Sequence, residues 1–400
     1  MSTFVIKNSR IVSRDCILDD YAAVISDGRI ENLVAAGEGS LRQMTEYETV
    51  DAGGRYLVPG YIDLHMHGAM SHLADWGPDR LSRLCEALPA FGVTGFLPAL
   101  TPQKDPDLEA GHLKELSAAS YSGAAILGFF LEGHYLAMSG SITSIPRDYS
   151  PERVRELIAA LQPYRVIFGI SPEVPGICGL LPIMTQYGAP AFITHTRATA
   201  EQTEAATLAG AVHATHFYDV FPYPGDKEPG VRGCGAVEAI LASDRTSVDF
   251  ILDGEHVEPL AVKLALKTLG PDRVCLITDA NVNAGMPPGI YPSMGGQEIT
   301  VAYEGAPARL GPSSQSPGGL NGSGLTMDRA VRNAVSLVGL PLPQAVAMAS
   351  ANPARVLGLD GRKGQIKAGY DADLLLLDEA LRVTDTWIAG RPVFSKLKIT

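Results

Sequence analysis

Hydrophobic positions in the middle of the chain fall into short runs that alternate with stretches of helical spacing. Residues 151–162 and 258–270 are two such stretches, where apolar positions recur every three or four residues. The runs predicted as strands are residues 61–67, 93–100, 125–133, 166–173, 191–196, 212–218, 249–256 and 275–280. Eight strands that alternate with helices are typical of a (β/α)8 barrel. A doubly wound sheet is the alternative, but it needs fewer strands and usually an early Gly-rich phosphate loop, which this chain lacks.

The two ends of the chain show a different pattern, in which β-branched residues are interrupted by turn pairs such as Asp-Gly and Gly-Gly. Neither end has a helical stretch long enough to build a domain alone. Because chain ends in compact folds often lie close together, we expect residues 1–57 and 356–400 to form one small β-sandwich. The barrel then occupies residues 58–355.

Charge and composition narrow the function classes. The chain has 32 Lys and Arg against 44 Asp and Glu, a net charge of −12, which disfavours nucleic acid and anionic membranes as partners. No apolar run reaches the roughly 18 residues of a membrane span, and the first residues lack the apolar core of a signal peptide. The 5 cysteines include no Cys-X-X-Cys pair, so neither a disulfide framework nor a thiolate zinc site is indicated. We therefore expect a cytoplasmic protein that acts on a small molecule.

Residues able to bind metal ions occur where the predicted strands end. These residues are His65, His67, Glu132, His195, His216 and Asp279. The carboxyl ends of barrel strands face the active site, so six such residues at one edge predict a metal centre there. Histidine and carboxylate ligands suit Zn, Fe, Mn or Co alike, and the spacing allows one or two divalent ions.

His65 and His67 are two residues apart, so their side chains point to the same face of a strand. An isolated His-X-His pair is more often structural, but here it ends a strand and precedes Gly68. A carboxylate at the end of an apolar run, such as Glu132, is costly to bury without a cationic partner. Asp279 can both bind a metal and move a proton, because metal ions lower the pKa of bound water to near 7.

The chain resembles the amidohydrolase superfamily, and within it the N-acetylglucosamine-6-phosphate deacetylases, over almost its whole length. The motifs that carry the resemblance are PGYIDLHMHG at 59–68, LEG at 131–133, ATHFYDVFP at 214–222, DGEHV at 253–257, ITDA at 277–280 and NGSGLTMDRAVRNAV at 321–335. The resemblance implies metal-dependent removal of an acetyl group from an amino sugar, in a homodimer. It also implies that His65, His67, Glu132, His195 and His216 are metal ligands, that Asp279 is the general base and acid, and that His256 contacts the substrate.

Several positions depart from the family pattern. His134 replaces a Pro, and Ser141 and Ile142 follow Gly140 where the family has the His that polarises the acetyl carbonyl. His134 is either a loop histidine satisfied by its surroundings or a substitute for that missing group. Asp219 replaces an Asn, and Lys227 replaces the Arg that binds phosphate in the family.

A carboxylate at position 219 would repel a phosphate dianion, unless Asp219 pairs with Lys227. An unphosphorylated N-acyl compound or a cyclic amide therefore stays open as the substrate. A ring deaminase and a non-catalytic scaffold are further alternatives. A scaffold would be free to lose His65, Glu132 or Asp279, and all three are present.

Overall fold

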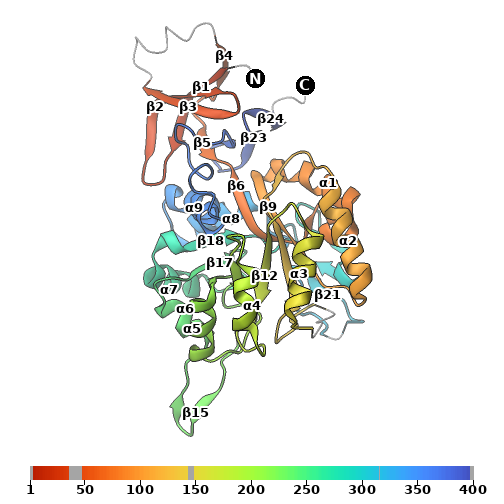
Figure 1. Cartoon of the computed structure of the whole chain (residues 1–400). Coiled ribbons are helices and arrows are strands. Elements are labelled where there is room, and N and C mark those ends of the chain that lie inside the picture. The colour runs from red at the N-terminus through yellow and green to blue at the C-terminus, as the bar shows by residue number, and fades with distance from the viewer. Residues whose placement is uncertain (1–2, 36–46, 143–147, 315, 397–400) are drawn as a thin grey trace.

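The computed structural model describes residues 3–35, 47–142, 148–314 and 316–396. A barrel with helices around it forms the larger part, and a sheet built from both chain ends lies at one end of it (Figure 1). The barrel strands follow one another in chain order and run parallel. They are β6 (Tyr61–Met66), β9 (Val93–Leu100), β11 (Phe129–Tyr135), β12 (Val166–Ile170), β13 (Ala191–Ile193), β14 (Ala211–Ala214), β17 (Ser247–Ile251) and β18 (Val274–Ile277).

The ring of strands closes between β18 and β6. The backbone N–H of Asp279 donates to the carbonyl of His65 at 2.9 Å, and that of His67 donates to Ala280 at 2.9 Å. A short strand, β10 (Ala125–Ile126), pairs in parallel with the first half of β9, at Gly95 and Phe96. The predicted (β/α)8 barrel is confirmed.

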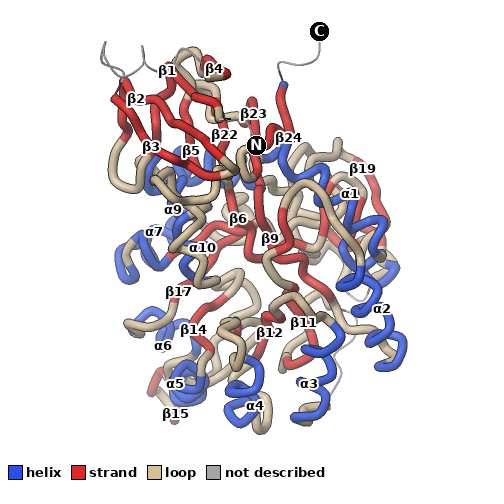
Figure 2. The backbone as a smooth tube through the Cα atoms, turned by 45° about the horizontal axis from the view of Figure 1, so that its top comes forward, coloured by secondary structure: helices blue, strands red, loops and turns tan. Residues whose placement is uncertain are grey.

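Helices surround the barrel on its outer side (Figure 2). They are α1 (Pro78–Ala87), α2 (Pro106–Ala118), α3 (Pro151–Ala160), α4 (Ile177–Met184), α5 (Ala200–Ala209), α6 (Ala236–Ala242), α7 (Pro259–Leu269), α8 (Met327–Asn333), α9 (Leu342–Ala349) and α10 (Ala351–Val356). Capping residues mark where several of these helices begin. In α3, for example, Ser150 caps the N-terminus and Pro151 takes the first helical position. Two apolar residues of α3, Val154 and Leu157, are fully buried, so this face packs on the barrel.

The strands of both chain ends join in one mixed sheet. Its members are β1 (Phe4–Val12), β2 (Ile17–Ser26), β3 (Arg29–Ala35), β4 (Glu48–Asp51), β5 (Tyr56–Pro59), β22 (Leu374–Leu377), β23 (Val383–Ile388) and β24 (Arg391–Ser395). The antiparallel pair β5–β22 connects the N-terminal strands to the C-terminal ones. The expected small β domain from both ends is present, and its exact limits stay a prediction.

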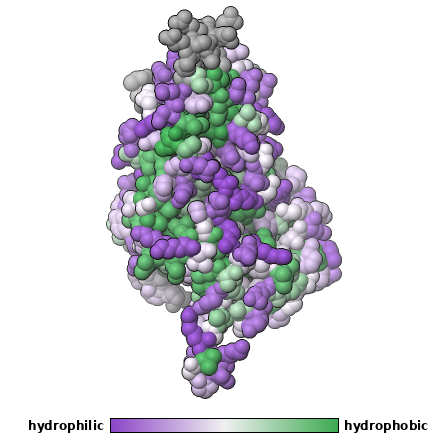
Figure 3. Space-filling model, turned by 90° about the vertical axis from the view of Figure 1, so that its left-hand side faces the viewer, coloured by the Kyte–Doolittle hydropathy of each residue, from purple (hydrophilic) through white to green (hydrophobic). Residues whose placement is uncertain are grey.

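Other short strands lie outside both parts. The hairpin of β15 (Asp226–Glu228) and β16 (Val231–Arg232) projects from the barrel end opposite the terminal sheet (Figure 1). Seen from the side, this projection is largely hydrophilic (Figure 3). Between β18 and α8 the chain forms a three-stranded sheet of β19 (Gly289–Pro292), β20 (Glu298–Val301) and β21 (Arg309–Leu310), and β7 (Gly68–Ala69) pairs with β8 (His72–Leu73). None of the helices in the described part of the chain is long and apolar enough to cross a membrane.

Candidate functional site

The predicted ligands lie at the carboxyl ends of the barrel strands, several of them in strained backbone. His195, His216 and Asp279 lie two residues after the ends of β13, β14 and β18, with φ angles of 48°, 36° and 43°. Residues other than glycine rarely adopt such left-handed values, and strained backbone of this kind clusters at functional sites. Each of these three strands is therefore followed, two residues after its end, by a polar residue that lines the cavity at the barrel mouth.

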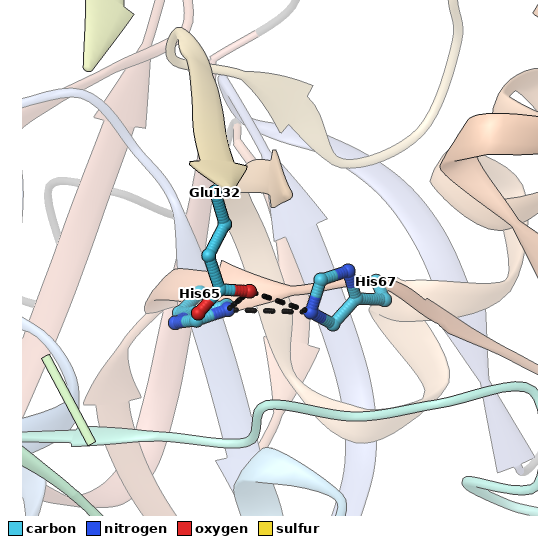
Figure 4. Close-up of side chains that lie close together, drawn as sticks. All are labelled: His65, His67 and Glu132. Carbon is cyan, nitrogen blue, oxygen red and sulfur yellow. Dashed lines mark hydrogen bonds and ion pairs between the residues drawn. The ribbon is translucent and has the colours of Figure 1, made fainter. Parts of the chain in front are cut away.

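Glu132 on β11 is the centre of the cluster. One carboxylate oxygen, Oε2, lies 3.2 Å from Nε2 of His65 and 3.2 Å from Nε2 of His67 (Figure 4). The other oxygen, Oε1, lies 3.3 Å from Nε2 of His195 and 3.0 Å from Nε2 of His216. The structure thus gives two buried groups of possible metal ligands that share Glu132: His65, His67 and Glu132, and Glu132, His195 and His216.

Asp279 joins the first of these groups. Its Oδ1 lies 3.4 Å from Nε2 of His65 and 3.4 Å from Nε2 of His67. This oxygen is buried and accepts no hydrogen bond within the described residues. A buried carboxylate oxygen that meets imidazoles only at this longer distance is better satisfied by a cation, which a metal ion would supply.

The electrostatics of the cluster also fit a cation. Burial alone would raise the pKa of Glu132, but His65, His195 and His216 hold it well below its usual value. Burial lowers the pKa of His67, yet Asp279 and Glu132 more than compensate and raise it to about 10. Glu132 likewise raises the pKa of His216 to about 10, against the effect of burial. The site attracts positive charge, and its nitrogen and oxygen donors suit a divalent metal ion.

A cavity of about 260 Å³ opens onto the cluster. It is lined by His67, Glu132, Gly140, Ser141, Ile142, His195, His216, Asp219, Val220, His256, Asp279, Met294, Leu320 and Gly322. The His256 side chain is fixed by Asp253, whose Oδ2 lies 2.6 Å from Nδ1. Burial lowers the pKa of His256, but Asp253 and, further off, Asp219 and Asp279 raise it overall. No Lys or Arg lines the cavity in the described part of the chain.

Two predicted substrate contacts lie elsewhere. His134 does not line the cavity, and its Nε2 lies 3.0 Å from Oε1 of Glu109, which also pairs with Arg153. Lys227 is exposed on the β15–β16 hairpin, and it forms no ion pair with Asp219 within the described residues. The structure therefore brings His256 and Asp219 to the cavity, but not His134 or Lys227.

Sequence reasoning missed the polar residues that hold the ligands. Asp63 on β6 accepts hydrogen bonds from the Thr278 hydroxyl at 2.6 Å and from the His65 N–H at 3.2 Å, which ties β6 to β18. The Ser171 hydroxyl donates to the carbonyl of His195 at 2.8 Å. Asp63 could have been found, because it lies two residues before His65 on the same strand face. Ser171 gives no such signal, because its role depends on the pairing of β12 with β13.

Comparison with known proteins agrees with this geometry. Residues 265–393 match the amidohydrolase family model. Over 396 residues the chain is 33% identical to N-acetylgalactosamine-6-phosphate deacetylase of Escherichia coli O157:H7, covering 97% of this chain and 99% of that one. It is 31% identical over 389 residues to N-acetylglucosamine-6-phosphate deacetylase of Lysinibacillus sphaericus, covering 94% and 97%.

A solved structure supports the same relationship. A mutant of N-acetyl-D-glucosamine-6-phosphate deacetylase from Mycobacterium smegmatis, in complex with N-acetyl-D-glucosamine-6-phosphate, superposes with a TM-score of 0.85 at 28% identity. The match covers 99% of this chain and 100% of that one. The chain therefore belongs to the amidohydrolases, within the family of the N-acetylhexosamine-6-phosphate deacetylases.

Proposed function

We propose that this protein hydrolyses the acetamide bond of an N-acetyl amino sugar in the 260 Å³ cavity at the barrel mouth. The observation that carries the proposal is Glu132, whose two oxygens each face a pair of imidazoles in a chain of this deacetylase family. His65 and His67 with Glu132 would hold one divalent ion, and His195 and His216 with Glu132 would hold another. A bound ion supplies water activation at neutral pH and polarisation of the acetyl carbonyl.

Asp279 is the proposed proton carrier. Its Oδ1, which accepts no hydrogen bond within the described residues, can accept the proton of the attacking water as that water adds to the acetyl carbon. The same carboxyl group then donates the proton to the departing sugar nitrogen, which leaves as an amine. His256, held by Asp253, faces the same cavity and is positioned to donate a hydrogen bond to a substrate oxygen.

A second candidate substrate is an N-acetyl amino sugar without the 6-phosphate that the names of the relatives carry. The cavity is lined by Glu132, Asp219 and Asp279, and by no Lys or Arg of the described residues. A phosphate dianion buried beside Asp219 would be repelled, since the two like charges would interact in a medium of low polarity. A neutral hydroxyl at that place could instead donate a hydrogen bond to Asp219.

A homodimer is the arrangement in which Lys227 could still serve a phosphorylated substrate. Lys227 and Arg232 lie on the β15–β16 hairpin, which projects from the barrel (Figure 1), and neither residue lines the cavity of its own chain. We propose that this hairpin is the part of the chain that reaches a second copy. Lys227 would then contribute its charge to the cavity of the partner subunit.

The test is release of acetate by protein reconstituted with Zn²⁺, Mn²⁺, Fe²⁺ or Co²⁺. The substrates are N-acetylglucosamine, N-acetylgalactosamine and their 6-phosphates, with simple N-acyl amines and cyclic amides for comparison. We expect hydrolysis of at least one N-acetyl hexosamine, and none after chelation. Release of ammonia instead of acetate, or hydrolysis of cyclic amides alone, would contradict the proposal.

A further inference from the structure

A buried pair of residues lies behind His216, outside the cavity. Asp249 on β17 is fully buried, and its Oδ1 accepts a hydrogen bond from the backbone N–H of His216 at 2.5 Å. Its other oxygen, Oδ2, lies 2.9 Å from Nε2 of His213 on β14. His213 is also fully buried, and its Nδ1 lies 2.7 Å from the Ser247 hydroxyl. Both oxygens of Asp249 are thus used, one of them on the backbone of a metal-ligand candidate.

The hydrogen bond to His216 falls at a point of backbone strain. His216 has a φ of 36°, which a side chain of its size adopts only when the surroundings impose it. The Asp249 carboxylate holds the N–H of His216, and the backbone carbonyl of Asp249 holds the next N–H, that of Phe217, at 2.9 Å. One residue of β17 therefore fixes two consecutive peptide groups just after β14.

His213 offsets the free-energy cost of burying the Asp249 carboxylate. A carboxylate without exposure to water is costly unless donors satisfy both oxygens. With its proton on Nε2, His213 donates to Oδ2 of Asp249, while the Ser247 hydroxyl donates to Nδ1. Neither His213 nor Asp249 lines the cavity, so their contact with the site runs through His216.

We propose that Asp249 and His213 are positioning residues that hold the His216 imidazole in place as a metal ligand. The inference rests on the proposed function only in requiring that His216 binds a metal ion. It does not depend on the substrate. The effect should be larger on the ion held by Glu132, His195 and His216 than on the other ion. Asp249 bonds the His216 backbone directly, whereas it reaches His65 only through Thr215, whose hydroxyl lies 3.0 Å from Nδ1 of His65.

The experiment measures metal binding directly, on purified full-length protein freed of metal by chelation. Co²⁺ is titrated in, and its visible absorption and stoichiometry are followed for wild type, Asp249→Ala, Asp249→Asn and His216→Ala. We expect Asp249→Ala to weaken the ion that His216→Ala also weakens, by about 10- to 100-fold. Asp249→Asn keeps an acceptor oxygen for the His216 N–H and should recover most of the affinity.

A double variant separates positioning from general loss of structure. If Asp249 acts through His216, adding Asp249→Ala to His216→Ala should weaken cobalt binding no further. The matched control is Asn352→Ala, which removes a buried side chain whose amide holds the carbonyls of Pro271 at 2.8 Å and Val274 at 2.7 Å, at the start of β18. This control should lower the melting temperature and leave cobalt binding unchanged.

Two results would overturn the proposal: an additive loss in the double variant, or wild-type cobalt affinity in Asp249→Ala alongside clear loss in His216→Ala. Should Asp249→Ala fail to fold, His213→Phe carries the same test, because it removes the donor to Oδ2, together with the Ser247 contact, and keeps the Asp249 carboxylate beside the His216 N–H. Protein that binds cobalt as expected but releases no acetate would refute the proposed function and leave this inference standing.

Discussion

Glu132 shows how a single side chain sets the chemistry of this site. It is almost fully buried, yet four imidazoles surround it, so its negative charge is balanced by positive charge drawn to the same place. Protons on the imidazoles and divalent ions compete for that place, because a histidine must lose its proton to bind a metal through Nε2. Metal binding should therefore depend on pH.

The raised pKa values of His67 and His216, both about 10, set the direction of that dependence. In metal-free protein their stabilising effect is complete below pH 6.5 and is lost as pH rises through about 10. Metal affinity changes in the opposite sense, since fewer protons must be displaced at higher pH. We expect the difference in melting temperature between metal-loaded and chelated protein to widen as pH rises from 6.5 towards 10. A constant or shrinking difference, measured by scanning calorimetry, would contradict this expectation.

Asp279 gives a second prediction at this scale. Asp279→Asn keeps the size of the side chain and an oxygen ligand but cannot carry a proton. We expect the variant to retain most of its metal, because His65, His67 and Glu132 remain, while turnover falls by roughly 10²- to 10⁴-fold. Metal content and acetate release would be measured on the same sample. Turnover within tenfold of wild type would mean that another group moves the proton.

At the scale of elements, the barrel strands were predictable, but the short strands outside both the barrel and the terminal sheet were not. The strand β9 matches its predicted run of residues 93–100, because it is apolar throughout and buried on both faces. The β19–β21 sheet and the β15–β16 hairpin were missed, because short, partly exposed strands lack a regular apolar pattern.

The ligands show the same division between what the sequence indicates and what only the fold reveals. His65 and His67 are recognisable from their spacing at the end of a strand. The pairing of His134 with Glu109 depends on α2 packing beside β11, which no local pattern indicates. Asp249 is hidden in the same way, because its role appears only when β17 lies next to β14.

The loop between β14 and α6 carries the prediction for substrate preference. Asp219 in this loop lines the cavity, whereas Lys227 does not. Asp219→Asn removes a negative charge without changing shape, so it should raise the ratio of kcat/KM for a phosphorylated sugar to that for its unphosphorylated twin by about tenfold. Adding Lys227→Arg should raise the ratio further if the hairpin serves a partner's cavity, because Arg binds phosphate with two donors.

The wild-type preference decides between the two candidate substrates. A wild type that already favours the phosphorylated sugar a thousandfold, and loses that preference in Lys227→Ala, would place the phosphate on the hairpin of a second copy. The same preference without any effect of Lys227→Ala would mean that the phosphate is held by other residues. Either result would refute the repulsion assigned to Asp219.

At the scale of the whole molecule, the terminal sheet is tied to the chain that leaves the barrel. Lys363, which follows α10, lies 2.6 Å from Oδ2 of Asp373 and 3.0 Å from Oδ2 of Asp371. The carbonyl of Asp373 accepts a hydrogen bond from the N–H of Gly60 at 2.8 Å, just where β5 leads into β6. One largely buried lysine thus bridges two carboxylates where the sheet and the barrel meet, and Arg362 supplies a second positive charge to Asp371 at 2.7 Å.

Lys363→Met tests how much this junction contributes to stability. The variant keeps the length of the side chain but leaves Asp373 without its cation, so we expect the free energy of unfolding to fall by roughly 3 kcal/mol at neutral pH.

Burial lowers the pKa of Lys363, but Asp373 and Asp371 raise it above its usual 10.5. Its stabilising effect is therefore complete below pH 10.5 and is lost as pH rises through the raised pKa. Wild type should lose stability in that alkaline range, and Lys363→Met should lose less.

The matched control is Lys367→Met, which replaces an exposed lysine of the same segment and should unfold like wild type in urea. Equal stability of Lys363→Met and Lys367→Met would show that the sheet is held to the barrel by apolar packing and backbone hydrogen bonds, without help from the buried charges.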